Sequence, residues 1–356
     1  MRLHLLIGIL LVLSSCSGSQ DEIVIGAILP LNGDLASLGE SAQHALELAV
    51  EDNPGIRLIV EDEGNCDTKL ALSATQKLIS IDHVDALIGP ICAGPFKATQ
   101  PVTTTAEIPH FGPIMNQGLI DDGNVSSPYA IGLLPPPKMI WKRLAEHAIT
   151  LGAKIAIINA IDGGSELNVQ NFVKRFNELG GEVVFHEKVP IGTRDFRTTI
   201  TKIDQTDALV WPHLFRDDRI AFYAQVEELA ALEDQTILGD LYIDLEPQKY
   251  IDALGPLLEG AVLTNFKQAT SPEFLERFTQ RYGEAPALGA DNSYDSLMLA
   301  VRGIKECGDD AACVIRSVKE GPYSGASGLL AFDENGERAG EVSVKTIING
   351  TVVITG

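Results

Sequence analysis

The segment that decides the fold is IVIGAILPLNGDLASLGESAQHALELAVEDNPGIRLIVEDE, residues Ile23 to Glu63. Ile23–Leu29 is an almost wholly apolar run rich in β-branched residues and ended by Pro30, which is typical of a strand buried on both faces of a parallel sheet. In the next part, apolar residues recur at helical spacing and form one stripe: Ala42, Ala45, Leu46, Ala49 and Val50. Ile56–Val60 then indicates a second strand. The crossover is long enough to make the two strands parallel and the unit right-handed.

The alternation of strand and helix continues after this unit. Helices are expected over Thr68–Ile81 and Phe96–Ala106, with short strands at Ala86–Ile88 and Ile108–Phe111. After a stiff stretch at Pro135–Pro137 the pattern restarts, with helices at Pro137–Leu151, Leu167–Leu179, Phe196–Ile203 and Asp218–Ala231 and strands at Lys154–Asn159, Val183–Val189, Ala208–Trp211 and Thr236–Leu238. The predicted fold class is therefore α/β, with two doubly wound lobes joined by a hinge that the chain crosses more than once.

The two lobes are predicted to be discontinuous in sequence. A strand at Gly260–Asn265 leads back to helices of the first lobe at Pro272–Tyr282, Asn292–Cys307 and Ala311–Lys319, and the tail from Leu329 is rich in strands, with Asn335-Gly336 typical of a tight hairpin. We expect lobe 1 to comprise residues 22–132 and 265–328, and lobe 2 to comprise residues 133–264 and 329–356. A ligand would bind between them, at the carboxyl ends of the strands of both sheets.

The amino terminus has the features of an export signal. Arg2 precedes a short apolar run at Leu5–Leu13, and Leu13-Ser14-Ser15-Cys16 resembles a bacterial lipobox. This run is shorter than the roughly 20 residues that span a bilayer. We therefore expect residues 1–16 to be a signal peptide with a lipidated Cys16, residues 17–21 to be a linker, and the domain to face the periplasm or the cell exterior. The alternative is an ordinary signal peptide cut near Ser17 or Ser19.

Composition and motifs exclude several classes of function. The chain has 356 residues, 45% of them hydrophobic, which is enough apolar material for two cores, and a formal net charge of −22. This charge argues against nucleic acid or an anionic lipid surface as a direct partner, although a solvated acidic surface explains it equally well. The sequence contains no HExxH, GxxxxGK[ST], GxSxG or GxGxxG motif. We expect neither an enzyme nor a bound cofactor.

Four cysteines remain once Cys16 is set aside, an even number that suits an exported protein with disulfides. Cys66 follows the second predicted strand and Cys92 the third, so that both lie at neighbouring strand ends within bonding reach. Cys307 and Cys313 flank a local loop, and whether they are bonded stays open. No histidine stands at ligand spacing from either pair, so we expect no metal site.

Five segments, in order along the chain, carry a resemblance to a known family: IGAILPLNGDLASLGE (Ile25–Glu40), LIGPICAG (Leu87–Gly94), KIAIINAIDG (Lys154–Gly163), RDFRTTITKI (Arg194–Ile203) and LLAFDENGE (Leu329–Glu337). Together they resemble the leucine/isoleucine/valine-binding family of extracytoplasmic solute receptors, which have the type I periplasmic-binding fold. The resemblance implies a receptor that closes on a small amino-acid-like ligand and delivers it to the membrane subunits of an ABC permease. A sensory module for a membrane partner and a lipoprotein that regulates an envelope protein are the alternatives.

For the first lobe, the resemblance implies a pocket formed by three loops: Asp34–Gly39, Ala93-Gly94 and Pro113–Asn116. The candidate contacts are Leu38, Ala93, Gly94, Ile114, Met115 and Asn116. Gly94 lies at the start of a helix, whose unpaired N–H groups favour a carboxylate. Amino-acid-binding members of the family carry Ser or Thr in the second and third loops, whereas this chain keeps only Asn116 as a polar side chain. The loss of hydroxyls indicates a larger or more apolar ligand than a small polar amino acid.

For the second lobe, the resemblance implies contacts near Ile161–Ser165, His213–Phe215 and Asp240–Tyr242. The candidates are Gly163, Gly164, His213, Phe215, Asp240 and Tyr242, with the two glycines where members often place a stacking tyrosine. Asp240 is expected either to bind a ligand ammonium group or to cap the following turn. His213 is either a ligand contact or a structural histidine, and the two aromatic residues are either walls of the pocket or core.

Overall fold

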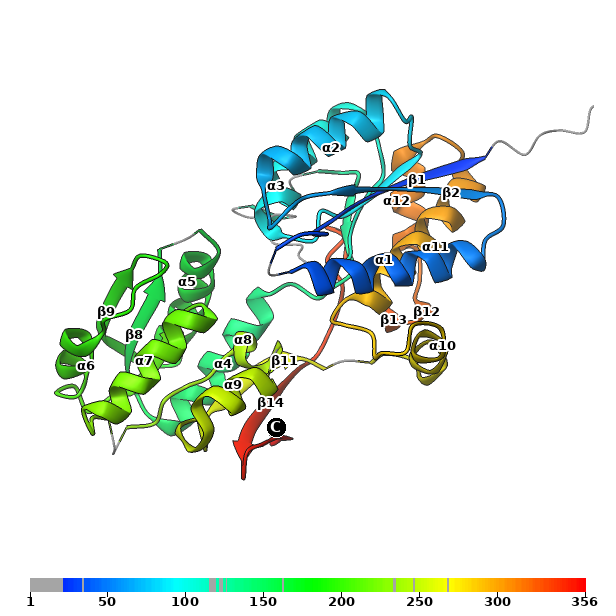
Figure 1. Cartoon of the computed structure of the whole chain (residues 1–356). Helices are drawn as coiled ribbons and strands as arrows, with labels where there is room; N and C mark the ends of the chain where they lie inside the picture. Colours follow the sequence, from blue (N-terminus) through cyan, green and yellow to red (C-terminus); the bar gives the residue numbers. More distant parts are fainter. Residues whose placement is uncertain are drawn as a thin grey trace, which may run out of the picture.

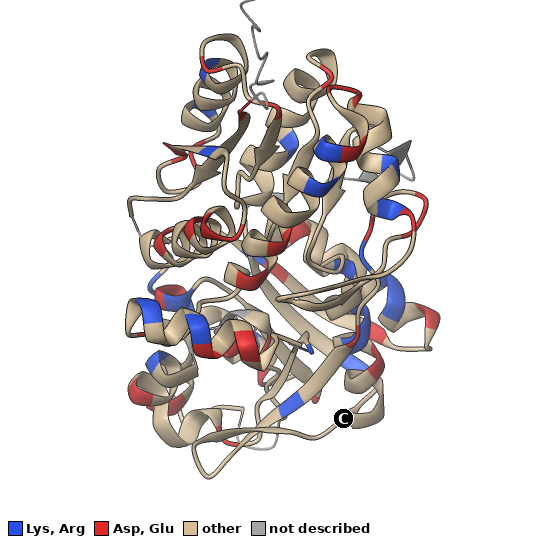
Figure 2. Cartoon of the chain, turned by 90° about the vertical axis from the view of Figure 1, so that its right-hand side faces the viewer, with Lys and Arg blue, Asp and Glu red and all other residues tan. Residues whose placement is uncertain are grey.

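The chain folds into two α/β lobes, each with a central sheet (Figure 1). This computed structural model describes residues 22–33, 35–114, 120–121, 124–125, 127–161, 163–232, 235–245, 247–267 and 269–356. The predicted signal peptide, Cys16 and the linker lie outside the described residues. Acidic residues are spread over both lobes, with Lys and Arg among them (Figure 2).

The first lobe is built on a parallel sheet in the order β2-β1-β3-β4-β7. Its strands are β1 (Ile23–Leu29), β2 (Ile56–Asp62), β3 (Ala86–Ile88), β4 (His110–Gly112) and β7 (Ala130–Gly132). The predicted βαβ unit is confirmed, because β1 pairs in parallel with β2 from Ile23 opposite Ile56 to Leu29 opposite Asp62. Two short strands, β5 (Ile120–Asp121) and β6 (Asn124–Val125), form a separate antiparallel pair.

Helices cover both faces of this sheet. α2 (Thr68–Ser80) and α3 (Ala93–Thr105) lie on one face, while α1 (Ala36–Glu51), α11 (Ala290–Cys307) and α12 (Ala311–Lys319) share the main core on the other. α10 (Pro272–Tyr282) packs against α1, and the hairpin of β12 (Tyr323–Gly325) and β13 (Gly328–Leu330) follows α12. Coverage on both faces explains why β1 is almost wholly apolar.

The second lobe contains a mixed sheet. β8 (Lys154–Ala160), β9 (Glu182–Val189) and β10 (Leu209–His213) are parallel, whereas β11 (Val262–Phe266), β14 (Val342–Ile348) and β15 (Thr351–Ile354) are antiparallel. Isolated bridges at residues 237–238 join the two halves. The helices are α4 (Lys138–Leu151), α5 (Gly163–Glu178), α6 (Arg197–Ile203), α7 (Arg216–Glu228), α8 (Leu241–Leu245), α9 (Pro247–Leu254) and the 3₁₀ turn η1 (Gly255–Leu258). The predicted doubly wound architecture is confirmed.

The lobes are joined by three chain crossings, as the prediction of a hinge crossed more than once requires. The crossings run from β7 to α4, from β11 to α10 and from β13 to β14. Leu330 packs in the core of the first lobe, whereas Val342 packs in that of the second. The residue limits expected for the lobes, 22–132 with 265–328 and 133–264 with 329–356, stay a proposal.

Several element boundaries differ from the sequence-based expectations. α3 begins at Ala93 rather than Phe96, and α5 begins at Gly163 rather than Leu167. The N–H groups of the first helical turn have no partner within the helix, so this turn does not depend on helix-favouring side chains. A first turn made of glycine and alanine also carries no apolar repeat from which the sequence could predict it. The expected strand at Thr236–Leu238 forms only isolated bridges. The corrected starts place Ala93, Gly94, Gly163 and Gly164 in first helical turns.

Both disulfides are present. Cys66 bonds to Cys92 with their Cα atoms 5.5 Å apart, and Cys307 bonds to Cys313 at 5.7 Å. The first pairing confirms the prediction from strand ends, and the second settles the state that the sequence left open. Among the described residues there is no group of His, Cys, Asp and Glu that could hold a metal ion, and no described helix is long and apolar enough to cross a membrane.

Candidate functional site

The strands of the first lobe point their carboxyl ends toward the second lobe (Figure 1). The loops after β1 and β3 therefore lie on the side where a ligand shared by both lobes would bind. Leu38 is half-buried in the first turn of α1 and packs on the main core. Ala93 is half-buried and Gly94 is exposed, so both are accessible to a ligand.

The amino terminus of α3 offers two unused hydrogen-bond donors. Cys92 is the N-cap residue and makes no side-chain cap. Neither the Ala93 nor the Gly94 N–H has a hydrogen-bond partner among the described residues, and Pro95 has no N–H. A Cβ placed on Gly94 would meet only Thr68 Oγ1, at 3.9 Å. Open space, two donors and the positive end of a helix dipole together suit a carboxylate.

A buried acidic side chain, that of Glu63, hydrogen-bonds the backbone just before α3. Glu63 follows β2 directly and is 0% exposed, and its Oε1 accepts the Ile91 N–H at 2.9 Å. Burial raises the pKa of the Glu63 carboxyl to about 8, against the opposing hydrogen bonds of the Ile91 and Cys92 N–H groups, and the charge of Asp62 adds to the rise. Asp62 itself accepts the N–H groups of Leu31 and Gly64. Two consecutive carboxyl groups thus hold the loops after β1 and β3.

The third predicted loop is described only in part. Ile114 is 1% exposed and belongs to the main core, where a Cβ on Gly289 would clash with it. Its side chain is therefore not accessible to a ligand in this conformation. Met115 and Asn116 lie outside the described residues.

In the second lobe, the predicted residues separate into surface and interior. Gly163 and Gly164 begin α5, and Phe215 is half-buried immediately before α7. The side chain of Tyr242 lies outside the described residues. His213 and Asp240 are each 0% exposed. These two candidates are interior residues of the lobe.

Asp240 is the centre of a buried network. Arg219 donates to its Oδ1 and its Oδ2, each at 2.7 Å, and His213 Nδ1 lies 2.8 Å from Oδ2. Burial alone would raise the pKa of Asp240. The Arg219 guanidinium and the His213 hydrogen bond instead hold this pKa below its usual range. The carboxylate is thus an anion already neutralised within the lobe. Its main-chain carbonyl accepts the N–H groups of Ile243 and Asp244 at the start of α8.

His213 has partners at both ring nitrogens and lies against two tryptophan rings. Its Nε2 lies 3.3 Å from the Asn168 amide nitrogen, and its ring centroid lies 4.9 Å from that of Trp141 and 4.8 Å from that of Trp211. This is the environment expected for a structural histidine. A contact between His213 and a ligand stays a prediction, as does binding of an ammonium group by Asp240.

Sequence reasoning missed Arg219 and Glu63. A signal existed for Arg219, because it shares the helical face of Phe222, Tyr223 and Val226, and a charge on an apolar face indicates a buried partner. No pattern marked Glu63, since acidic residues are common at strand ends.

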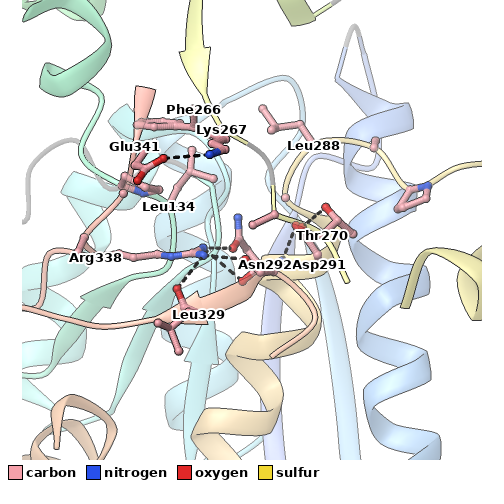
Figure 3. A pocket seen from close by; sticks show the side chains of 18 residues that line it. Leu134, Phe266, Lys267, Thr270, Leu288, Asp291, Asn292, Leu329, Arg338 and Glu341 are labelled. Carbon is pink, nitrogen blue, oxygen red and sulfur yellow. Dashed lines mark hydrogen bonds and ion pairs between the residues drawn. The ribbon is translucent and has the colours of Figure 1, made fainter. Parts of the chain in front are cut away.

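A cavity of about 340 Å³ lies at the hinge, between all three crossings. Arg338 lines it and donates to the Leu133 carbonyl at 2.9 Å, to Asn292 Oδ1 at 2.9 Å and to the Ser327 carbonyl at 2.7 Å. Figure 3 shows this guanidinium beside Asn292, with Asp291 bonded to Thr270 on the adjoining wall. Of the residues predicted to contact a ligand, those that the structure describes do not line this cavity. The Arg338 hydrogen bonds at its wall tie the crossings to α11.

Comparison with known proteins decides the family. Residues 22–344 match the family model described as periplasmic binding protein. The chain belongs to the periplasmic binding protein family. This is a family of binding proteins and not of enzymes, as the motif analysis predicted. Among its relatives is Leu/Ile/Val-binding protein homolog 7 of Brucella melitensis biotype 1, which is 24% identical over 370 residues covering 95% of this chain and 92% of the relative.

Solved structures confirm the type I periplasmic-binding fold. A leucine-binding protein from Thermotoga maritima superposes with a TM-score of 0.80 at 22% identity, covering 94% of this chain and 98% of that one. A solute-binding protein of an ABC transporter from R. palustris, solved in complex with benzoate, gives a TM-score of 0.77 at 20% identity, covering 94% and 95%. The resemblance to the leucine/isoleucine/valine-binding family is confirmed, and at these identities the solved structures establish the fold alone.

Proposed function

We propose that this periplasmic binding protein is the lipid-anchored receptor of an ABC uptake system, which closes its lobes on a small carboxylate ligand and delivers it to the permease. The supporting observation is the amino terminus of α3, where the Ala93 and Gly94 N–H groups have no partner among the described residues. This terminus follows β3, at the end of the lobe-1 sheet that is directed toward the second lobe (Figure 1). Closure would bring the start of α5 at Gly164 and the residue before α7, Phe215, over a carboxylate held there. Only the closed arrangement would present both lobes together to a membrane partner.

The structural neighbours support a carboxylate as the recognised group. One is a leucine-binding protein, and another was solved with benzoate. Leucine and benzoate share a carboxylate and an apolar body, but only leucine has an ammonium group. In the described part of lobe 2, the acid predicted to bind an ammonium group is already paired with Arg219. We therefore propose that the ligand is an organic acid rather than an α-amino acid.

The anchor is proposed from the lipobox at Leu13–Cys16. Each buried methylene of an acyl chain adds about 0.8 kcal/mol of membrane affinity. Labelling of cells with a radioactive fatty acid tests the anchor directly: the wild-type chain should carry the label, and Cys16→Ser should not. Label retained in Cys16→Ser would contradict this part of the proposal.

The receptor function is tested by a thermal-shift panel on the purified protein after unfolding and refolding to remove bound ligand. The panel contains benzoate, 4-hydroxybenzoate, aliphatic acids, leucine, isoleucine and the matching amides. A ligand at about 100 times its Kd stabilises by about 2.7 kcal/mol, which raises Tm by several degrees in a chain of this size. We expect shifts from acids and none from their amides. Equal shifts from acid and amide, or a flat panel, would contradict the proposed ligand class.

A further inference from the structure

We propose that Glu63 determines the charge selectivity of the lobe-1 site: in its protonated form it leaves the amino terminus of α3 free for the carboxylate of a ligand, so that binding is coupled to proton uptake. This inference rests on the proposed function, because it requires the ligand to bind at Ala93 and Gly94. It concerns a residue beneath the site rather than a contact of the ligand itself.

The Glu63 carboxyl group lies directly beneath the start of α3. Glu63 is 0% exposed, its Oε1 accepts the Ile91 N–H at 2.9 Å, and the Cys92 N–H also bonds the carboxyl. The disulfide between Cys66 and Cys92 ties the turn that follows Glu63 to the same helix terminus. Because Ile91 and Cys92 immediately precede α3, the carboxyl group lies at the interior side of the terminus whose outer side carries the two unused donors.

Among the described residues, the Glu63 carboxyl group has no compensating charge. Glu63 Oε2 has no hydrogen-bond partner, and Glu63 makes no ion pair with any residue that the structure describes. An ionised carboxylate buried without a cation is unfavourable, so the proton stays on the carboxyl at neutral pH. Oε2 is the natural place for this proton, since Oε1 accepts the Ile91 N–H.

The other titratable groups on the elements that meet here leave Glu63 without a neutralising partner. Asp62, next in sequence, is an anion that opposes ionisation of Glu63. The Asp67 carboxylate accepts the Lys69 and Leu70 N–H groups at the start of α2. On β4, burial lowers the pKa of His110 to about 4 despite the bond between its ring and the Gly89 carbonyl, so it is neutral at pH 7.

The cations on these elements do not compensate Glu63 either. Lys69 on α2 and Lys97 on α3 are exposed and form no ion pair with it. Of the groups named, Asp62 is therefore the one whose charge acts on Glu63, and it favours the neutral form.

The consequence is competition between two anions for one helix terminus. An ionised Glu63 on the interior side would repel a ligand carboxylate bound at the Ala93 and Gly94 N–H groups. Both anions would also compete for stabilisation by the positive end of the α3 dipole. A neutral Glu63 removes this conflict. Conversely, a bound carboxylate makes Glu63 harder to ionise. By linkage, the complex must bind more protons than the free protein wherever free Glu63 is ionised.

The sign of the pH dependence follows. Below about pH 7, Glu63 is protonated with or without ligand, and affinity does not depend on its titration. Above about pH 8 the free protein loses the Glu63 proton and must take it up again to bind. Affinity should therefore fall by up to about tenfold between pH 7 and pH 9.

The test is isothermal titration of the full chain in detergent with benzoate, 4-hydroxybenzoate and isoleucine, at pH 7 and pH 9. Titration at pH 8.5 in two buffers of different ionisation enthalpy measures proton uptake. Benzoate has no group that titrates in this range, so any proton uptake with benzoate belongs to the protein. The phenol of 4-hydroxybenzoate and the ammonium group of isoleucine begin to titrate here, so the proton count is taken from benzoate. We expect weaker binding at pH 9 and uptake approaching one proton per ligand.

Glu63→Gln is the decisive variant, because it keeps a hydrogen-bond acceptor and the side-chain size but cannot ionise. It should bind with the wild-type affinity of pH 7 at both pH values and take up no proton. Glu61→Gln is the matched control, since Glu61 is paired with Lys77 on the surface of β2 and should keep the wild-type pH dependence. The wild-type uptake measurement stands even if Glu63→Gln folds poorly.

The outcomes separate the inference from the function on which it rests. Binding of an acid with the same Kd at pH 7 and pH 9, or without proton uptake, would overturn the role of Glu63 and leave the receptor function intact. A pH dependence that persists in Glu63→Gln would also overturn it. No binding by either aromatic acid in wild type and Glu63→Gln at either pH would overturn the proposed ligand class and this inference together, whether or not isoleucine binds.

Discussion

The guanidinium of Arg219 donates to both carboxylate oxygens of Asp240, each at 2.7 Å, and neither residue is more than 1% exposed. This pair joins α7 to the segment before α8 beneath the face of lobe 2 that a ligand would meet. A salt bridge in this position stabilises the lobe only while both partners are present, because each alone would be an uncompensated buried charge.

Arg219→Met should therefore lower the free energy of unfolding by about 3–5 kcal/mol. The double variant Arg219→Met/Asp240→Leu should recover much of this loss, since both charges are then absent. Urea denaturation followed by far-UV circular dichroism measures both values. Arg197→Met, which breaks an exposed pair with Glu228, is the control and should cost less than about 1 kcal/mol. Similar losses for Arg219→Met and Arg197→Met would contradict the buried-pair account.

Glu63 should make stability depend on pH even without ligand. Its pKa is raised to about 8 in the folded chain, from an ordinary value of 4.5, so the folded state binds more protons between these pH values. The free energy of unfolding should therefore fall as pH rises toward 8, by up to about 1.4 kcal/mol per pH unit. Glu63→Gln should lose this slope between pH 7 and pH 8, and Glu61→Gln should retain it. Parallel slopes in wild type and Glu63→Gln would show that Glu63 does not titrate in this window.

Arg338 should be essential to the hinge. It is 9% exposed and donates to Leu133 before the first crossing, to Asn292 on α11 and to Ser327 beside β13. Arg338→Met leaves these acceptors without their charged donor, and we expect a loss of at least about 2 kcal/mol in the free energy of unfolding. Lys267→Met, at an exposed pair on the rim of the same cavity, should change it by less than about 1 kcal/mol. Equal effects would mean that the Arg338 network adds no stability.

The fold was predictable because its signals are local and repeated. The apolar run of β1, the stripe of α1 and the run of β2 each have their own periodicity, and their order predicts a parallel unit without any knowledge of contacts. The pairing of Cys66 with Cys92 followed from the same order, since both come after strands of one sheet. The start of α3 was misplaced, because Ala93-Gly94-Pro95 has no apolar repeat although it suits a first helical turn.

The site was less predictable because its partners are distant in sequence. Asp240 was expected either to bind a ligand ammonium group or to cap the following turn, and its pairing with Arg219 and His213, from the preceding helix and strand, was not foreseen. Ile114 was expected to face the ligand, but it packs against Gly289, which belongs to the second sequence segment of the same lobe. The hinge cavity is lined by residues of all three crossings, and no local pattern indicates such a meeting.

The central claim is that the first-turn N–H groups of α3 bind the carboxylate of the ligand, and Ala93→Pro tests it most directly. Ala93 is the first residue of the helix, where proline is well tolerated, and the preceding Cys92 has φ −80° and ψ 140°, which proline also accepts. The change removes one donor while leaving the helix in place. Ala311→Pro is the matched control at the first position of α12, far from the site.

The measurement is the Kd of the tightest-binding acid of the panel for wild type, Ala93→Pro and Ala311→Pro, with Tm recorded for each. A hydrogen bond to a charged group is worth about 1.5–3 kcal/mol, so Ala93→Pro should weaken binding about tenfold to a hundredfold with little change in Tm. Ala311→Pro should bind as wild type does. Wild-type affinity in a folded Ala93→Pro variant would show that the ligand carboxylate binds elsewhere.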